Sequence, residues 1–465
     1  MSIIHTAVPE ESLEREGSAA AAPRAATLRP TRRQERIASM DVLRGVALLG
    51  ILIMNVTSFS LPEWAYFIPL GTAKPVFTGP HADLNTAAWF LRWITMEGKM
   101  RGLFSLLFGA GAVLLTSRLE KYGDTAADIF LRRNMWLTLF GILHAYLVWY
   151  GDILYFYGLS ALIFLFPCRK LAARSLLTAG IVILIVCSCV GPVSGGQMLQ
   201  DFQLHHKAEA AQSLRNSPAL TDGQTADIKA WNDRLEAWKP GKKAIDADMA
   251  AMHSGYVGAQ LYDAAIAKQW ETDVYYSFGF ADVLSMMLIG MGLFKCGFIT
   301  GDLSRRTYVL TALAGLVTSV PLVAFGAWKA WASHFDLLTT DLWILLPYDL
   351  GRATGAITIA SVVLLIVKSA ALPALTRRFA AIGQTALSNY LLTSILCQVV
   401  FVWGPWPLYG ELEYYQLYFV VAGVWAVNLI WSPLWLRHCE FGPVEWVWRS
   451  LTYWQWQPLL RQKVA

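Results

Sequence analysis

The sequence contains few charged residues. Aspartate, glutamate, lysine and arginine make up 15% of its 465 residues, whereas they make up about a quarter of an average soluble chain. Hydrophobic residues reach 55%. This balance disfavours a soluble enzyme. The net charge of only +5, with basic residues clustered between apolar runs, likewise disfavours a nucleic-acid-binding protein.

The sequence also lacks recognisable motifs for a disulfide framework or a metal site. Its six cysteines form no C-x-x-C pair, and Cys187 and Cys189 lie inside an apolar run. His205 and His206 are adjacent, so they cannot share one helical face as metal ligands. We therefore predict no disulfide framework and no metal site.

Long, continuous apolar runs are what the sequence has in abundance. Because about 20 apolar residues span a bilayer as a helix, we predict an all-α polytopic membrane protein of about ten transmembrane helices. The runs do not alternate as barrel strands would. The expected spans are 40–60, 101–119, 134–150, 153–168, 173–193, 274–296, 306–331, 346–368, 382–403 and 414–436.

Basic residues gather in every second gap between these spans, beginning before residue 40. Positively charged loops stay in the cytoplasm, which predicts that both termini are cytoplasmic. The expected divisions are a disordered cytoplasmic arm (1–37), a first transmembrane half (38–193), an extracytoplasmic helical loop (194–273), a second transmembrane half (274–436) and a cytoplasmic interfacial tail (437–465). The loop is interpreted as a solvated cap or as a substrate-binding lid.

Two glycine-containing stretches echo each other. "LLFGAG" (106–111) and "MLIGMG" (287–292) lie in spans that are predicted to run in the same direction. The echo indicates either close helix contact through small residues or a parallel duplication into two five-helix halves.

Polar and ionisable side chains lie at regular spacing inside the first and third spans. Each costs about 3 kcal/mol in a bilayer, so each needs a partner or a function. Arg44 and Asn55 are eleven residues apart, as are Arg133 and His144. Eleven helical residues return to nearly the same face and rise about 16 Å. Asp41 is three residues before Arg44 and can pair with it. The two helices are therefore predicted to line one slot with cations at one end and polar groups at the other.

Further candidates follow along the chain. Asp152 is interpreted as an orienting partner of His144 or as a cap of the following helix. Tyr157 faces back towards the third span, and Asn389 either bonds a neighbouring helix or contacts substrate. For the arginines the alternative is a cytoplasmic anchor, and for His144 it is a packing histidine bonded to a carbonyl.

Several motifs resemble the YeiB family of bacterial inner-membrane proteins, over the chain from about residue 36. The residues that carry the resemblance are Asp41, Leu43, Arg44, Gly45 and Asn55, then "FSLLFGAG" (104–111), His144 with "GDIL" (151–154), "ALSNYLL" (386–392) and "FGPVEWVWRSLT" (441–452). That family is similar to a broader group of transmembrane acyltransferases. The group includes the type-3 acyltransferases and the heparan-α-glucosaminide N-acetyltransferases.

The resemblance implies a multi-pass protein of the bacterial inner membrane. It would move an acyl group, for example acetyl, from cytoplasmic acyl-CoA to a glycan, lipid or small-molecule acceptor on the far side. Arg44 and Arg133 would bind the CoA phosphates, and Asp41, as the partner of Arg44, would belong to the same cofactor-binding site. His144 would act as general base or carry the acyl group. Asp152 would orient it.

Asn55 would stabilise the oxyanion, while Tyr157 and Asn389 would contact substrate. The chain departs from the type-3 pattern, in which a histidine follows the first-span arginine, because Asn55 occupies that position. The heparan acetyltransferases have asparagine there and use a later histidine, and His81 matches that position only loosely. Two alternatives remain open, namely a secondary transporter or exporter of a small molecule or lipid, and a non-catalytic scaffold. Homodimerisation is also left open.

Overall fold

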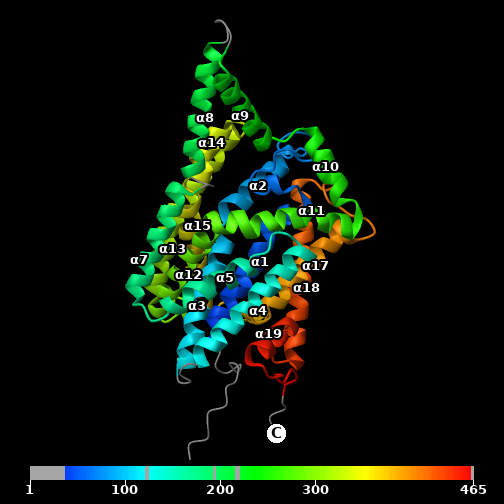
Figure 1. Cartoon of the computed structure of the whole chain (residues 1–465). Coiled ribbons are helices and arrows are strands. Elements are labelled where there is room, and N and C mark those ends of the chain that lie inside the picture. The colour runs from blue at the N-terminus through cyan, green and yellow to red at the C-terminus, as the bar shows by residue number, and fades with distance from the viewer. Residues whose placement is uncertain (1–36, 121–124, 192–194, 215–219, 462–465) are drawn as a thin grey trace, which may run out of the picture.

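The computed structural model describes residues 37–120, 125–191, 195–214 and 220–461. The predicted N-terminal arm lies almost entirely outside these residues. The described regular structure consists of helices (Figure 1).

The helices of the N-terminal part are α1 (Ala38–Ser60), η2 (Glu63–Ala65), α2 (Ala82–Thr95), α3 (Lys99–Leu119), α4 (Thr125–Leu147), α5 (Leu154–Ser160), η4 (Ala161–Leu165), α6 (Phe166–Cys168) and α7 (Ala173–Val190). The segment predicted as a helical loop contains α8 (Gly195–Ser213), α9 (Asp222–Trp238), α10 (Lys242–Met252) and α11 (Gly255–Gln269).

The C-terminal part contains η5 (Trp270–Gly279), α12 (Phe280–Lys295), α13 (Arg305–Ala332), α14 (Leu337–Thr340), η6 (Asp341–Leu345), α15 (Tyr348–Ser369), α16 (Pro373–Gln384), α17 (Ala386–Gln398), η7 (Val399–Trp403), η8 (Tyr414–Gln416), α18 (Leu417–His438) and α19 (Pro443–Tyr453). In Figure 1, α8 and α9 project from the top of the bundle and α19 lies at the bottom.

The prediction of an all-α polytopic membrane protein is confirmed. Eight helices of the described chain are long and apolar enough to cross a membrane. All ten expected spans correspond to helices. The two that fail the length and composition test are α4, which carries charged residues, and the shorter apolar helix Leu154–Cys168.

The two glycine stretches that echo each other pack against one another. A Cβ atom on Gly109 would lie 2.0 Å from the carbonyl oxygen of Met287, and one on Gly290 would lie 2.0 Å from that of Leu106. The reciprocal contact lets α3 and α12 approach backbone to backbone, as small residues allow in membrane helices. Gly45 and Gly383 do the same for α1 and α16, since their added Cβ atoms would lie 2.0 Å and 1.8 Å from the opposite carbonyls.

Gly290→Ala is expected to destabilise the protein by about 3 kcal/mol, because the obstructing atom belongs to a backbone that cannot rotate away. The thermal unfolding midpoint in detergent measures the effect. Gly423→Ala in α18 is the matched control, since nothing lies within 4 Å of a Cβ atom there. Equal midpoints for the two variants would contradict the close-contact role.

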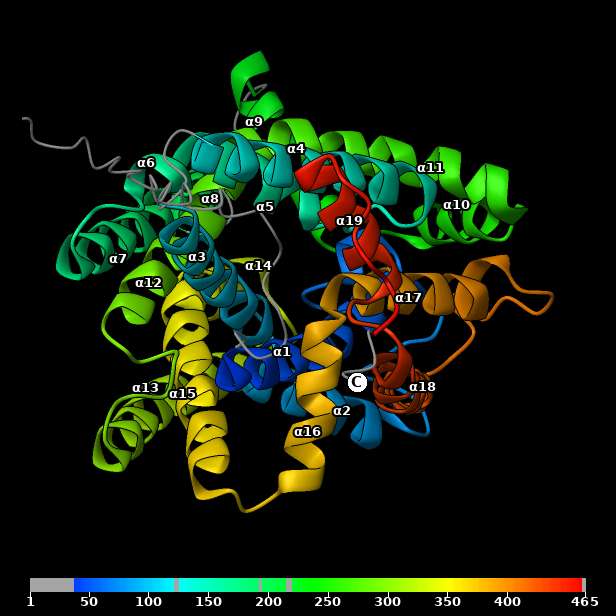
Figure 2. The same cartoon turned by 90° about the horizontal axis from the view of Figure 1, so that it is seen from below.

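The C-terminal helix α19 packs into the end of the bundle, beside α17 in the view from below (Figure 2). Glu445 is buried and accepts hydrogen bonds from the backbone N–H groups of Leu387 (2.6 Å) and Ser388 (3.1 Å). A carboxylate at this position satisfies free donors at the start of α17 and is favoured by its dipole.

Part of the tail is therefore packed inside the bundle. Glu445 binds the start of α17, and Trp448 is buried. Trp454 and Trp456 are exposed, as a residue at a membrane surface would be.

Candidate functional site

His144 and Asp152 form a buried pair between α4 and α5. Nδ1 of His144 lies 2.9 Å from Oδ1 of Asp152, and both side chains are almost completely shielded from solvent. Because a carboxylate only accepts hydrogen bonds, this contact places the hydrogen on Nδ1. In the neutral ring, Nε2 is then the basic nitrogen.

The chain reversal after α4 brings these two residues together. The carbonyl of His144 accepts the backbone N–H groups of Val148 and Trp149, both at 2.9 Å, which ends the helix. Helix rise alone suggests a separation of about 10 Å, but the tight reversal makes the contact direct. The second oxygen of Asp152 accepts the backbone N–H of Tyr155 at 2.8 Å. Asp152 thus contacts His144 and caps α5 at once.

Aromatic side chains enclose the imidazole. The ring of Tyr390 lies 5.1 Å from it and the ring of Trp149 lies 6.3 Å away, measured between centroids. Nε2 is buried and has no hydrogen-bond partner among the described residues. A buried polar atom without a partner costs about 1–3 kcal/mol, so this nitrogen is well placed to receive a proton or a reacting atom.

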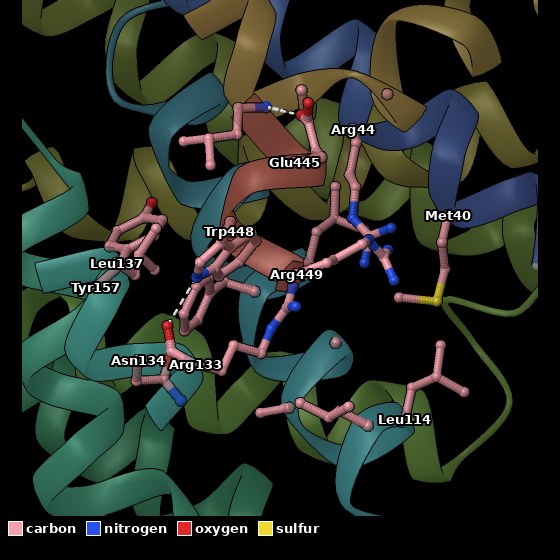
Figure 3. Close-up of a pocket in the computed structure, with 18 of the residues that line it drawn as sticks. Met40, Arg44, Leu114, Arg133, Asn134, Leu137, Tyr157, Glu445, Trp448 and Arg449 are labelled. Carbon is pink, nitrogen blue, oxygen red and sulfur yellow. Dashed lines mark hydrogen bonds between the residues drawn. The ribbon is translucent and has the colours of Figure 1, made fainter. Parts of the chain in front are cut away.

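A cavity of about 230 Å³ opens at the end of the bundle that carries α19, and we call it the arginine cavity. Four arginines and two acids of the described chain line it, which leaves an excess of two positive charges. They are Arg44 of α1, Arg118 of α3, Arg133 of α4, Arg449 of α19, Asp41 and Glu445. Figure 3 shows the labelled arginines Arg44, Arg133 and Arg449 reaching into the same space.

Contacts with neighbouring side chains position these guanidinium groups. Arg44 Nη1 lies 3.1 Å from Asp41 Oδ1, the pair that the sequence predicts. The guanidinium of Arg133 stacks on Trp448, 3.6 Å from the ring centroid, and the Trp448 indole donates to the Arg133 carbonyl at 2.8 Å (Figure 3). Such stacking favours the cation.

A second cavity of about 320 Å³ lies further along the bundle, and we call it the aromatic cavity. Ten aromatic side chains line it, namely Tyr66, Phe67, Trp149, Tyr150, Phe156, Tyr157, Trp270, Phe278, Tyr348 and Tyr390. Asn55 and Asp152 also contribute to its wall. Tyr157 and Tyr390 line both cavities. The predicted slot is therefore divided into two cavities that meet at these two tyrosines.

Hydrogen bonds hold the two tyrosines in place. The hydroxyl of Tyr157 shares a 2.7 Å hydrogen bond with Ser105, and the hydroxyl of Tyr390 accepts the backbone N–H of Ile153 at 3.3 Å. Tyr390 also lies 3.5 Å from Asp152 through its hydroxyl. The boundary between the cavities is thus tied to the His144–Asp152 pair.

A buried ion-pair network forms part of the wall of the aromatic cavity. Asp282 of α12 binds Arg101 of α3 at 2.5 Å and also binds Arg352 of α15. Arg352 in turn binds Asp349, three residues earlier in α15, at 2.8 Å. Asp282 joins three helices through charged contacts.

Most of the predicted site residues lie around these two cavities. Arg44, Asp41 and Arg133 line the arginine cavity, Asn55 and Asp152 line the aromatic cavity, and Tyr157 lines both. His144 contacts the second cavity through Asp152.

Asn389 does not join this group. Its side-chain nitrogen donates to Thr385 and Ser432, both at 2.9 Å, and its oxygen accepts from Trp431 at 2.8 Å. It is completely buried and bonds α17 to α18, which is the helix-packing alternative. His81, the other histidine considered, is half-exposed and pairs with Glu413.

Sequence reasoning missed four residues of the site. Arg118 and Arg449 line the arginine cavity but were not among the predicted site residues. Tyr390 stands within the quoted motif "ALSNYLL" beside Asn389, and Asp282 lies near the start of an apolar span. An acid inside an apolar span is the signal that would have identified Asp282.

The fold and the buried groups define a polytopic α-helical membrane protein with two internal cavities and a histidine–aspartate pair beside their boundary. Residues 293–455 match the family model described as "Protein of unknown function (DUF418)". The chain is 29% identical to the protein YxaH of Bacillus subtilis over 94% of its own length and 99% of that relative.

It is 28% identical to the protein YeiB of Escherichia coli, over 90% of this chain and 96% of that one. A 39.9 kDa protein encoded beside an amylase in Bacillus acidopullulyticus is 25% identical over 94% of this chain and 99% of the relative. These findings confirm the resemblance to the YeiB family. The names of these relatives state no activity, so the comparisons do not define a reaction.

Proposed function

We propose that the protein is a transmembrane acyltransferase. It would take an acyl group from acyl-CoA bound through the arginine cavity and pass it to an acceptor in the aromatic cavity. The observation that carries this proposal is the meeting of the two cavities at Tyr157 and Tyr390, directly beside the His144–Asp152 pair.

The arginine cavity has the charge that a nucleotide thioester needs. Arginine binds phosphate through paired N–H donors, and the surplus of positive charge favours a polyanion. In the proposed orientation this cavity faces the cytoplasm, where acyl-CoA is present. The pantetheine arm would extend along the faces of α1 and α4, whose cationic and polar groups are about 16 Å apart by helix rise.

The proposed reaction requires one group that accepts a proton and one that donates a hydrogen bond to the developing oxyanion. Nε2 of His144 would remove a proton from the acceptor hydroxyl or amine as its oxygen or nitrogen attacks the thioester carbonyl. The carbon–sulfur bond then breaks, a carbon–oxygen or carbon–nitrogen bond forms, and the proton passes to the CoA thiolate. Asp152 would stabilise the imidazolium through Nδ1. Asn55 would donate to the developing oxyanion.

Arg133→Ala is expected to weaken CoA binding at least tenfold, because one charged hydrogen bond to phosphate contributes about 1.5–3 kcal/mol. Isothermal titration of the purified protein with CoA measures it. Arg132→Ala is the matched control, since Arg132 is the adjacent residue of α4 and does not line the arginine cavity. Equal CoA affinity for the two variants would reject the donor site.

A carrier is the second candidate, and the buried Arg101–Asp282–Arg352 network favours it, because such networks also build substrate and proton pathways. A carrier would move solute across proteoliposome membranes without consuming acyl-CoA. Solute flux that the unchanged protein sustains in proteoliposomes without acyl-CoA, and that protein-free liposomes lack, would support the carrier against the acyltransferase.

A further inference from the structure

The aromatic cavity has a strongly negative wall. Besides its aromatic side chains, four acids and one arginine of the described chain line it, namely Glu63, Asp152, Asp282, Asp349 and Arg101. The cavity is therefore opposite in charge to the arginine cavity. Two ligands of different chemistry are expected on the two sides of Tyr157 and Tyr390.

Three of these acids already have protein partners. Asp152 binds His144, Asp282 binds two arginines and Asp349 binds Arg352. Glu63 differs, because the described part of the chain gives it no ion pair. Glu63 thus presents to the cavity a carboxyl group that has no ion-pair partner among the described residues.

The surroundings of Glu63 add negative potential and aromatic surface. Tyr150 lies within electrostatic reach of Glu63 and of two further acids, Asp248 and Asp263. Burial raises the pKa of Glu63 above its usual value, and the nearby Trp270 indole offsets part of this shift. A partly buried carboxylate among aromatic rings costs free energy unless a cation compensates it. Ring faces themselves attract ammonium groups, by about 0.5–2 kcal/mol each.

We propose that the aromatic cavity binds an organic ammonium compound, with its cationic group at Glu63 and its body against the walls formed by Tyr66, Tyr150 and Trp270. The cavity volume of about 320 Å³ is within the range of small-molecule sites. Asp152, which binds His144, lines the same cavity.

The role of a hydroxyl-bearing ammonium compound as the acyl acceptor rests on the proposed acyl transfer. Binding of such a compound in the aromatic cavity does not depend on that reaction. Choline is a suitable probe because its neutral isostere, 3,3-dimethyl-1-butanol, has the same shape and hydroxyl group without the charge. Binding of each compound to the purified full-length protein is measured by isothermal titration.

Choline is expected to bind at least tenfold more tightly than 3,3-dimethyl-1-butanol. Glu63→Gln should remove this preference, whereas Glu411→Gln, at an exposed carboxylate outside the cavity, should keep it. Equal affinity of the two probes for the unchanged protein would overturn the inference without any variant having to fold. A charge preference that persists in folded Glu63→Gln would overturn the role of Glu63.

The two proposals can fail separately. Choline binding without turnover of acetyl-CoA would keep the ammonium site and remove the acyltransferase. Acetyl-CoA turnover with no preference for choline would keep the acyltransferase and remove the ammonium site.

Discussion

Replacing His144 with asparagine is expected to abolish acyl transfer while leaving the protein folded. The amide nitrogen of asparagine can occupy the place of Nδ1 and keep the hydrogen bond to Asp152, so the buried carboxylate retains its partner. Nε2, which would accept the proton, is lost. General base catalysis contributes about 10²–10⁴-fold, so the turnover of acetyl-CoA should fall at least 100-fold.

The measurement is the release of CoA thiol from acetyl-CoA by the protein in proteoliposomes, with choline as the trial acceptor. His206→Asn provides the matched control, because it makes the same change at an exposed histidine in α8. Thermal unfolding of both variants checks the fold. Undiminished thiol release by His144→Asn would remove His144 from the proposed reaction.

His144→Ala is a less informative change. It removes the base and also leaves Asp152 buried without its imidazole partner, and breaking a buried pair in this way costs about 3–5 kcal/mol. Loss of activity in that variant would mix chemistry with unfolding. Comparing the asparagine variant with the alanine variant therefore separates the loss of the base, Nε2, from the loss of the hydrogen bond that Nδ1 makes to Asp152.

Asp282→Asn is expected to cause the largest loss of stability among the variants considered. The change removes the carboxylate that binds Arg101 and Arg352 and leaves two buried guanidinium groups sharing a neutral amide. Loss of one partner of a buried charge network costs about 3–5 kcal/mol. The thermal midpoint in detergent should fall sharply, and the yield of folded protein should fall with it.

Asp349→Asn is the control for this prediction. Asp349 binds Arg352, which keeps Asp282 as its other partner, so this variant should lose less stability. If both variants unfold at the same midpoint, Asp282 is not the centre of the network.

The membrane class and most helices could be predicted because apolar composition is a local property of the chain. The predicted count of about ten spans is higher than the eight helices that are long and apolar enough to cross a membrane. One reason is that α4 carries Arg132, Arg133 and His144. The faces of single helices were also predictable. Spacing alone placed Arg44 and Asn55 on one side of α1, and each lines one of the two cavities.

Contacts between distant segments could not be predicted in this way. Arg449 reaches the cavity of Arg44 only because α19 folds back onto α4, and Asp282 finds Arg101 and Arg352 through helix packing. The direct contact of His144 with Asp152 depended on the geometry of a reversal that helix rise does not describe. Sequence spacing gives directions within one helix, whereas the site depends on how several helices meet.

The docking of α19 has a consequence for biosynthesis. Three residues near the end of the chain, Glu445, Trp448 and Arg449, supply one wall of the arginine cavity, and Glu445 holds the first residues of α17. During translation the preceding helices enter the bilayer before this wall exists. A nascent protein therefore has an open-sided cavity until the ribosome has released its final residues, and a chain that stopped before residue 443 would keep it open.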